Sequence, residues 1–199
     1  MITPTPEITR AAWTAMQTAY NTKTIRKDDS DLMALVGTTL GLLGVIDKDR
    51  FMKGFTTTIN RAIYVPFEIG VDTPEHPLWS QLVICAHEHQ HVEQVDREGW
   101  ATFAAKYVCD HAARAVYEAE AYRCNIELQW WNRRGDAGWS KVYAKNVQEN
   151  YGCDEADAAV VEAALNLAYD DLRQNDVIVN AASIKMIQIL RLLGATEQP

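Results

Sequence analysis

Residues 82–91 read LVICAHEHQH, an apolar run followed directly by three of the five histidines in this 199-residue chain. On a helix, His87 and His91 lie four residues apart and project from one face, one turn apart. Two imidazoles in this arrangement can bind one metal ion. Glu88 leans beside that face, whereas His89 lies about 200 degrees around the helix and is expected at the surface or behind the ligands. The stretch therefore predicts a metal site on a helix.

His87, Glu88 and His91 form the motif H-E-x-x-H. In enzymes with this motif the metal lowers the pKa of a bound water, and the glutamate accepts the proton as the water attacks a carbonyl. Glu88 is accordingly the expected general base. The preceding residues, LWSQLVICA, are apolar enough to bury the helix, which favours a water-poor metal site.

A catalytic zinc also needs a third protein ligand and one open position. Gln94 and Arg97 stand where a metzincin would have its glycine and third histidine, so that solution is excluded. The later stretch YEAEAY offers Glu118 and Glu120 on different helix faces, and spacing alone does not select between them. His111 is a further alternative, although a single histidine at a helix start is more often a capping or surface group.

The composition is that of a globular protein, with 48% hydrophobic and 23% charged residues. The net charge of −8 is spread along the chain without a basic cluster, which argues against nucleic acid as a partner. Four cysteines lie far apart without a C-x-x-C pair and are expected as reduced, mostly buried thiols. The first residues lack the pattern of a secretory signal, and no apolar stretch is long enough to span a membrane, so we expect a cytoplasmic protein.

Local patterns predict an α+β fold that is predominantly helical. The stretch FTTTINRAIYVPFEI, residues 55–69, carries the one strong β signal, with Asn60 as a turn between two short strands and Pro66 limiting it to an edge or a strand end. A helix from about residue 78 to 97 carries the histidines and is broken by Gly99. The other expected helices cover residues 7–20, 31–43 (capped by Ser30 and ended by Gly44), 100–108, 111–133, 140–150, 154–173 and 177–193.

The stretch NRRGDAG, residues 132–138, is the plausible boundary within the chain. It divides residues 1–135, which hold the metal-site motif and the N-terminal helices, from an all-helical extension at 136–199. We expect this extension to pack on the first part, with Trp130 and Trp131 between them, as one compact domain.

A family resemblance supplements these patterns. HEHQHVEQVDREGWATFAAKYV followed by YEAEAY resembles the small gluzincin-type H-E-x-x-H proteins of bacteria and phages, over about residues 51–125. YEAEAY is also similar to the Glu-x-x-Ala-Asp motif of HtpX-like peptidases, whose first glutamate binds zinc and corresponds to Glu118. Tyr122 stands where that family has the aspartate that supports the histidines.

The resemblance implies a zincin-like core, in which a short edge strand or hairpin precedes the active-site helix. RAIYVPF would then pair as an edge strand with an extended substrate. Tyr64 or Tyr122 would stabilise the oxyanion, and spacing selects neither of the two.

Our first hypothesis is a zinc-dependent hydrolase of the peptidase class, with one Zn²⁺ per chain held by His87, His91 and Glu118 and with a peptide or protein substrate. The alternative is a catalytically inactive zincin-like structural or assembly protein that binds a protein partner, for example a virion or accessory component if the chain is phage-encoded. A ferritin-like di-iron site would need a second Glu-x-x-His, which the chain lacks.

Overall fold

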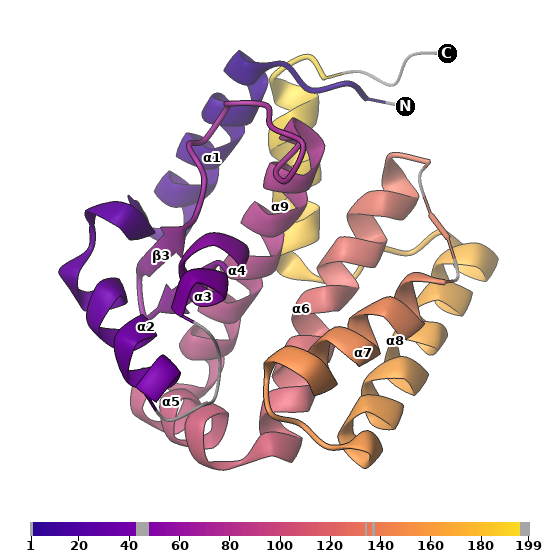
Figure 1. The fold of residues 1–199 in the computed structure, drawn as a ribbon. Coiled ribbons are helices and arrows are strands. Elements are labelled where there is room, and N and C mark those ends of the chain that lie inside the picture. Colours follow the sequence, from indigo (N-terminus) through magenta and orange to yellow (C-terminus); the bar gives the residue numbers. More distant parts are fainter. Residues whose placement is uncertain (1, 43–47, 134, 137, 196–199) are drawn as a thin grey trace.

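The chain folds as a set of helices with a small sheet on the side opposite the helices of residues 111–175 (Figure 1), in a computed structural model that describes residues 2–42, 48–133, 135–136 and 138–195. This confirms the expected α+β, predominantly helical class. In order, the elements are α1 (Pro6–Tyr20), β1 (Lys23–Arg26), η1 (Lys27–Asp29), α2 (Asp31–Leu42), α3 (Lys48–Gly54), β2 (Thr57–Ile59), β3 (Ala62–Val65), α4 (Leu78–Glu98), α5 (Trp100–Cys109), α6 (His111–Trp131), α7 (Trp139–Asn150), α8 (Glu155–Asn175) and α9 (Ala181–Leu192).

The sheet has the strand order β1-β3-β2. β2 and β3 form the predicted antiparallel hairpin, in which Thr57 pairs with Tyr64 and Asn60 turns with φ 53°. Asparagine tolerates this left-handed conformation better than most residues. Pro66 follows the last residue of β3, where its missing N–H costs no ladder bond.

Two expectations about the sheet are wrong. β1 was not predicted, because KTIR is short and polar, and it becomes a strand by pairing in parallel with β3, Lys23 opposite Ala62. As a result, β3 is the central strand, and RAIYVPF is not an edge. The edge strand next to the histidine helix is β2 instead.

α4 runs through the centre of the molecule and is buried on nearly all sides. Fifteen of its 21 residues are buried, because α1, α6, α9 and β2 pack around it. Pro77 precedes the helix, and Gly99 ends it with φ 83°, a conformation that favours glycine. The ring nitrogens of three histidines on a buried helix need hydrogen-bond partners, and the elements packed on two sides of α4 must supply them.

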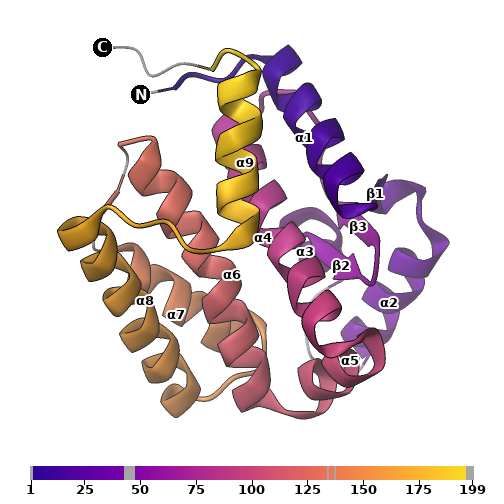
Figure 2. The ribbon, with the colours of Figure 1, turned by 180° about the vertical axis from the view of Figure 1, so that it is seen from behind.

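The later helices pack against two different parts of the molecule. α7 and α8 pack on α6, and the ring of Trp130 meets that of Tyr169 on α8 edge to face, whereas α9 returns to lie against α1 and α4 (Figure 2). The helix expected from residue 177 begins only at Ala181. The Glu127 carboxylate accepts the backbone N–H groups of Val179 and Asn180, which keeps this segment outside the helix.

The remaining expectations concern single features. Cys85, Cys124 and Cys153 are buried free thiols as expected, whereas Cys109 is exposed. Ser30 accepts the backbone N–H of Met33 and so caps α2, while the predicted stop at Gly44 lies outside the described residues. Among the helices of the described ranges, none combines the length and apolar character needed to cross a membrane.

Candidate metal centre

Three side chains converge between α4 and α6. His87 and His91 project from one face of α4, and their ring centroids lie 5.0 Å apart with an edge-to-face orientation. Nε2 of His87 lies 3.6 Å from one carboxylate oxygen of Glu118, and Nε2 of His91 lies 3.5 Å from the other. All three residues are buried. Together they form a group that could hold a metal ion.

Each histidine nitrogen lies at a distance from one Glu118 oxygen that is close to the donor spacing of a metal site. Zinc binds imidazole nitrogen and carboxylate oxygen at roughly 2.0–2.2 Å, which places the donors of a tetrahedral site about 3.4 Å apart. The 3.5 and 3.6 Å separations are close to this value. In addition, Oε2 of Glu118 is buried and has no hydrogen-bond partner among the described residues. Such an atom is costly to bury alone, and a cation held between the three side chains would partner it.

Glu118 comes from α6 and is held by a tyrosine of α5. Burial raises the pKa of the Glu118 carboxyl, but the imidazoles of His91 and His87 and the hydroxyl of Tyr107 outweigh burial, so the pKa is lowered. The Tyr107 hydroxyl donates to Oε1 of Glu118. Burial and the neighbouring carboxylate raise the pKa of Tyr107, so this phenol keeps its proton. The carboxylate is therefore ionised and fixed in orientation.

Both histidines are oriented by side-chain amides. Nδ1 of His87 lies 3.2 Å from Oδ1 of Asn125, and Nδ1 of His91 lies 2.8 Å from Oε1 of Gln94. Gln94 in turn donates its Nε2 to the backbone oxygen of Tyr117, which identifies the amide oxygen as the atom facing His91. With Nδ1 of each ring turned to these oxygens, Nε2 is the nitrogen that faces Glu118.

These supporting residues were missed by the sequence analysis. Two of them carry a signal of helical spacing: Gln94 follows His91 by three residues, and Asn125 follows Glu118 by seven, so each shares a helix face with a ligand. The support expected from the position of Tyr122 comes instead from Asn125, nearly one turn later. Tyr107 left no such signal, because it lies on a separate helix.

Glu88 faces a cleft beside the metal group. The cleft has a volume of about 350 Å³, and His87, Glu88, Tyr122 and Asn125 are among its lining residues. Oε2 of Glu88 accepts a hydrogen bond of 2.6 Å from Thr58 of the edge strand β2. This contact fixes the carboxylate at the border between the histidine helix and the sheet.

Glu120 points away from the centre. Its carboxylate accepts hydrogen bonds of 2.9 Å from both terminal guanidinium nitrogens of Arg97 and one of 2.7 Å from the amide of Gln90. The structure therefore brings Glu118, and not Glu120, to the two histidines, as the family resemblance implied.

Of the other candidate residues, Tyr122 lies at the cleft, whereas Tyr64 and His111 lie away from it. Tyr122 packs against His87 with ring centroids 4.9 Å apart, and burial followed by the charge of Glu118 raises its pKa. Tyr64 belongs to a separate apolar cluster that includes Met33 and Phe51. His111 pairs with Asp157 at the start of α8 and is not part of the group at His87.

His89 is neither exposed nor beside the ligands, so the expectation for it is wrong. It is fully buried on the α1 side of α4, where Nδ1 lies 2.7 Å from the backbone oxygen of Cys85 and Nε2 lies 3.0 Å from the hydroxyl of Thr22. Burial lowers the pKa of His89 to about 4, so the ring is neutral. It is a core residue that joins α4 to the chain after α1.

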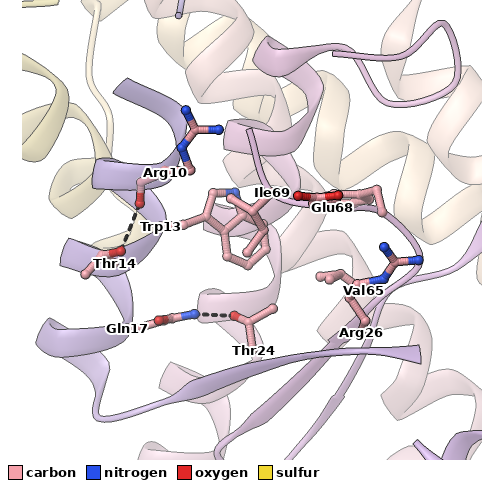
Figure 3. Close-up of a pocket in the computed structure, with 10 residues that line it drawn as sticks. Arg10, Trp13, Thr14, Gln17, Thr24, Arg26, Val65, Glu68 and Ile69 are labelled. Carbon is pink, nitrogen blue, oxygen red and sulfur yellow. Dashed lines mark hydrogen bonds between the residues drawn. The ribbon is translucent and has the colours of Figure 1, made fainter. Parts of the chain in front are cut away.

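A second cavity of about 350 Å³ lies between α1 and the sheet (Figure 3). Its two guanidinium groups already have acidic partners, since Arg10 pairs with Glu7 at 3.3 Å and Arg26 with Asp28 at 2.7 Å. No residue predicted for the metal site is among the described residues that line it. The cleft at His87, in contrast, is lined by one of the candidate ligands and by Glu88.

Comparison of the chain with protein-family models, with curated proteins and with solved structures gives no match. The inference of function therefore rests on the geometry of the centre.

Proposed function

We propose that the protein is a zinc-dependent peptidase with a zincin-like centre. The observation that carries this proposal is the convergence of His87, His91 and Glu118 in a buried group, beside a cleft that Glu88 lines. Two imidazoles and one carboxylate are the ligand set of many catalytic zinc sites, which keep a further position open. A structural zinc site would be closed by a fourth protein ligand.

Zinc held by these residues supplies a Lewis acid that polarises a carbonyl group and lowers the pKa of water. Glu88 performs the proton transfer: its carboxylate takes the proton of the attacking water and passes it to the leaving amine. The Thr58 hydroxyl holds one carboxylate oxygen of Glu88, which leaves the other for the water. In H-E-x-x-H hydrolases, too, the metal activates the water and the glutamate transfers the proton.

Tyr122 is the better of the two tyrosines for stabilising the oxyanion. Its ring packs against His87 and lines the cleft, and its raised pKa keeps the phenol protonated as a donor. A donor placed where negative charge develops lowers the barrier of the reaction. Tyr64 lies in another cluster and has no part in this proposal.

The test combines metal content with hydrolysis. Purified protein is dialysed against buffer with trace zinc, and the zinc per chain is measured for the wild type, for His87→Ala and for Glu88→Gln. We expect one zinc per chain in the wild type and in Glu88→Gln, whose amide oxygen can still accept from Thr58, and a loss of zinc in His87→Ala. The same samples are then incubated with a peptide mixture.

Wild type should cleave the mixture and Glu88→Gln should lose at least 100-fold in rate, since it retains the metal but lacks the base. An active Glu88→Gln variant would refute the mechanism. A wild-type protein without zinc would refute the metal site itself.

The second candidate function is an assembly protein that retains the metal without turnover. It is favoured by several exposed apolar side chains on the later helices, among them Val160, Leu167 and Leu192. It predicts one zinc per chain, no cleavage of any peptide, and self-association or partner binding that is lost when Leu167 and Leu192 are changed to Lys.

A further inference from the structure

The cleft beside the candidate centre has two walls of different origin. One consists of the segment that leads from α3 into β2, including Phe55 and Thr56. The other is formed by α6 and by helix α7 of the later part of the chain, which contributes Asn146 and Asn150. The later helices therefore shape the space next to the metal group, in addition to packing behind it.

The α7 wall carries a connected row of uncharged polar groups that starts at the metal group. Tyr122 packs its ring against His87, and its hydroxyl accepts a hydrogen bond from Nδ2 of Asn146. Oδ1 of Asn146 accepts in turn from Nδ2 of Asn150. The row therefore connects the ring beside a candidate ligand to two asparagines of α7 that line the cleft.

The hydrogen bonds of this row determine how Asn146 is oriented. An asparagine amide has two N–H hydrogens and an oxygen with two lone pairs. The bonds to Tyr122 and Asn150 use one of each, which leaves one donor and one acceptor on a half-buried side chain. A second amide group can bind to both, because its oxygen accepts from the free N–H of Asn146 and its own N–H donates to the free lone pair of the Asn146 oxygen.

The lining of the cleft contains no charge that could partner a charged substrate group on this side. Among the described lining residues, Glu88 is the one acidic residue, and none is Lys or Arg. Glu88 is already held by Thr58 at the metal group. A charged substrate side chain against Asn146 would lose its hydration for a neutral hydrogen bond and no counter-charge, which is costly, whereas a neutral amide would exchange water for the asparagine.

An aromatic pair lies among the lining residues of the cleft. Phe55 and Tyr151 meet edge to face with centroids 6.3 Å apart, and they join the two walls. A space of about 350 Å³ is at the lower end for ligand sites, so it suits one or two residues of a chain.

We propose that Asn146 determines substrate specificity, so that the cleft selects peptides with an uncharged, amide-bearing or small polar residue next to the cleaved bond and rejects charged residues there. This inference rests on the proposed peptidase function and adds the class of substrate to it. It assigns to α7 a direct role in binding.

The experiment compares the zinc-loaded wild type with Asn146→Asp. Each protein digests the same proteome-derived peptide mixture, and the residues around every cleaved bond are identified by mass spectrometry. Gln148→Glu is the matched control, because it adds the same charge to α7 at an exposed position that does not line the cleft. Zinc content and thermal unfolding are recorded for all three to show that fold and metal are retained.

For wild type and Gln148→Glu we expect Asn, Gln, Ser or Thr to be enriched at one position beside the cleaved bond, and Asp, Glu, Lys and Arg to be depleted there. Asn146→Asp should shift that one position toward Lys and Arg by at least 10-fold relative to Asn and Gln. An unchanged profile, or equal acceptance of charged residues by the wild type, overturns the inference while the peptidase function stands. No cleavage by zinc-loaded wild type overturns both.

Discussion

Asn125 places its side-chain oxygen 3.2 Å from Nδ1 of His87 and so orients the ring from behind with an uncharged group. Gln94 does the same for His91 at 2.8 Å. Aspartate often holds this position in zinc sites, and it strengthens the basicity of the imidazole as well as orienting it. Two amides orient the rings but add no charge, so the net charge of the ligand set comes from Glu118.

This arrangement predicts that Asn125→Leu binds zinc about 10- to 100-fold more weakly than the wild type, as is typical when the support of a ligand is removed. Competition with a chromogenic chelator measures the affinity. Asn125→Asp should bind at least as tightly as the wild type, because a carboxylate can accept the same hydrogen bond. Equal zinc affinity in Asn125→Leu would contradict the proposed support.

The two glutamates of YEAEAY should differ completely in their effect on metal content. Glu118→Gln removes the charged ligand between the histidines, and we expect zinc to fall from one per chain to near zero after dialysis. Glu120→Gln loses an ion pair with a half-exposed arginine, Arg97, so it should retain its zinc and lose less than about 1 kcal/mol of stability. Loss of zinc from the Glu120 variant alone would show that the ligand is assigned to the wrong residue.

His89 lies on the same helix as the candidate ligands His87 and His91, but we expect its loss to affect stability and not metal binding. His89→Ala should lower the free energy of unfolding by about 3 kcal/mol, because it leaves a cavity in the core and removes the partner of Thr22. Thr22→Val, which removes only that hydrogen bond, should cost about 1 kcal/mol. Urea unfolding with a chelator present isolates these effects from the metal, and zinc content of the folded variants should remain one per chain.

The pair between His111 and Asp157 should give a pH-dependent contribution to stability. The hydrogen bond to Asp157 raises the pKa of His111, so this contribution is fully present below 6.5, the ordinary pKa of histidine, and is lost as the pH rises through the raised value. Burial raises the pKa of Asp157, but the hydrogen bonds to His111 and to the Asp154 backbone, with the charge of His111, together lower it, so the contribution is present above 3.8 and is lost as the pH falls through the lowered value.

His111→Gln should therefore lower the melting temperature most between about pH 4 and 6.5, and the difference from wild type should shrink on both sides of this window. Thermal melts from pH 3 to 9 measure it. A constant difference for His111→Gln would show that the pair does not contribute through its charges.

Local features of the fold were predictable from the sequence because they depend on neighbours along the chain. Helical periodicity identified most of the helices, Gly99 ended α4 as expected, and Asn60 marked the turn of the hairpin. β1 was not predictable in this way, since KTIR forms a strand only through its pairing with residues about 40 positions later. The same pairing moved β3 from the edge to the centre of the sheet.

The sequence by itself determined that His87 and His91 share one helix face with Glu88 beside them, because a spacing of four residues and the helix pitch require it. It could not determine which glutamate joins them. Glu118 and Glu120 differ by about 200 degrees around α6, and only the packing of α6 on α4 decides which of them faces the histidines. Tertiary packing likewise decided that His89 enters the core, that Asn125 and Gln94 orient the rings, and that α7 forms a wall of the cleft, since these contacts join separate helices whose relative rotation no local spacing encodes.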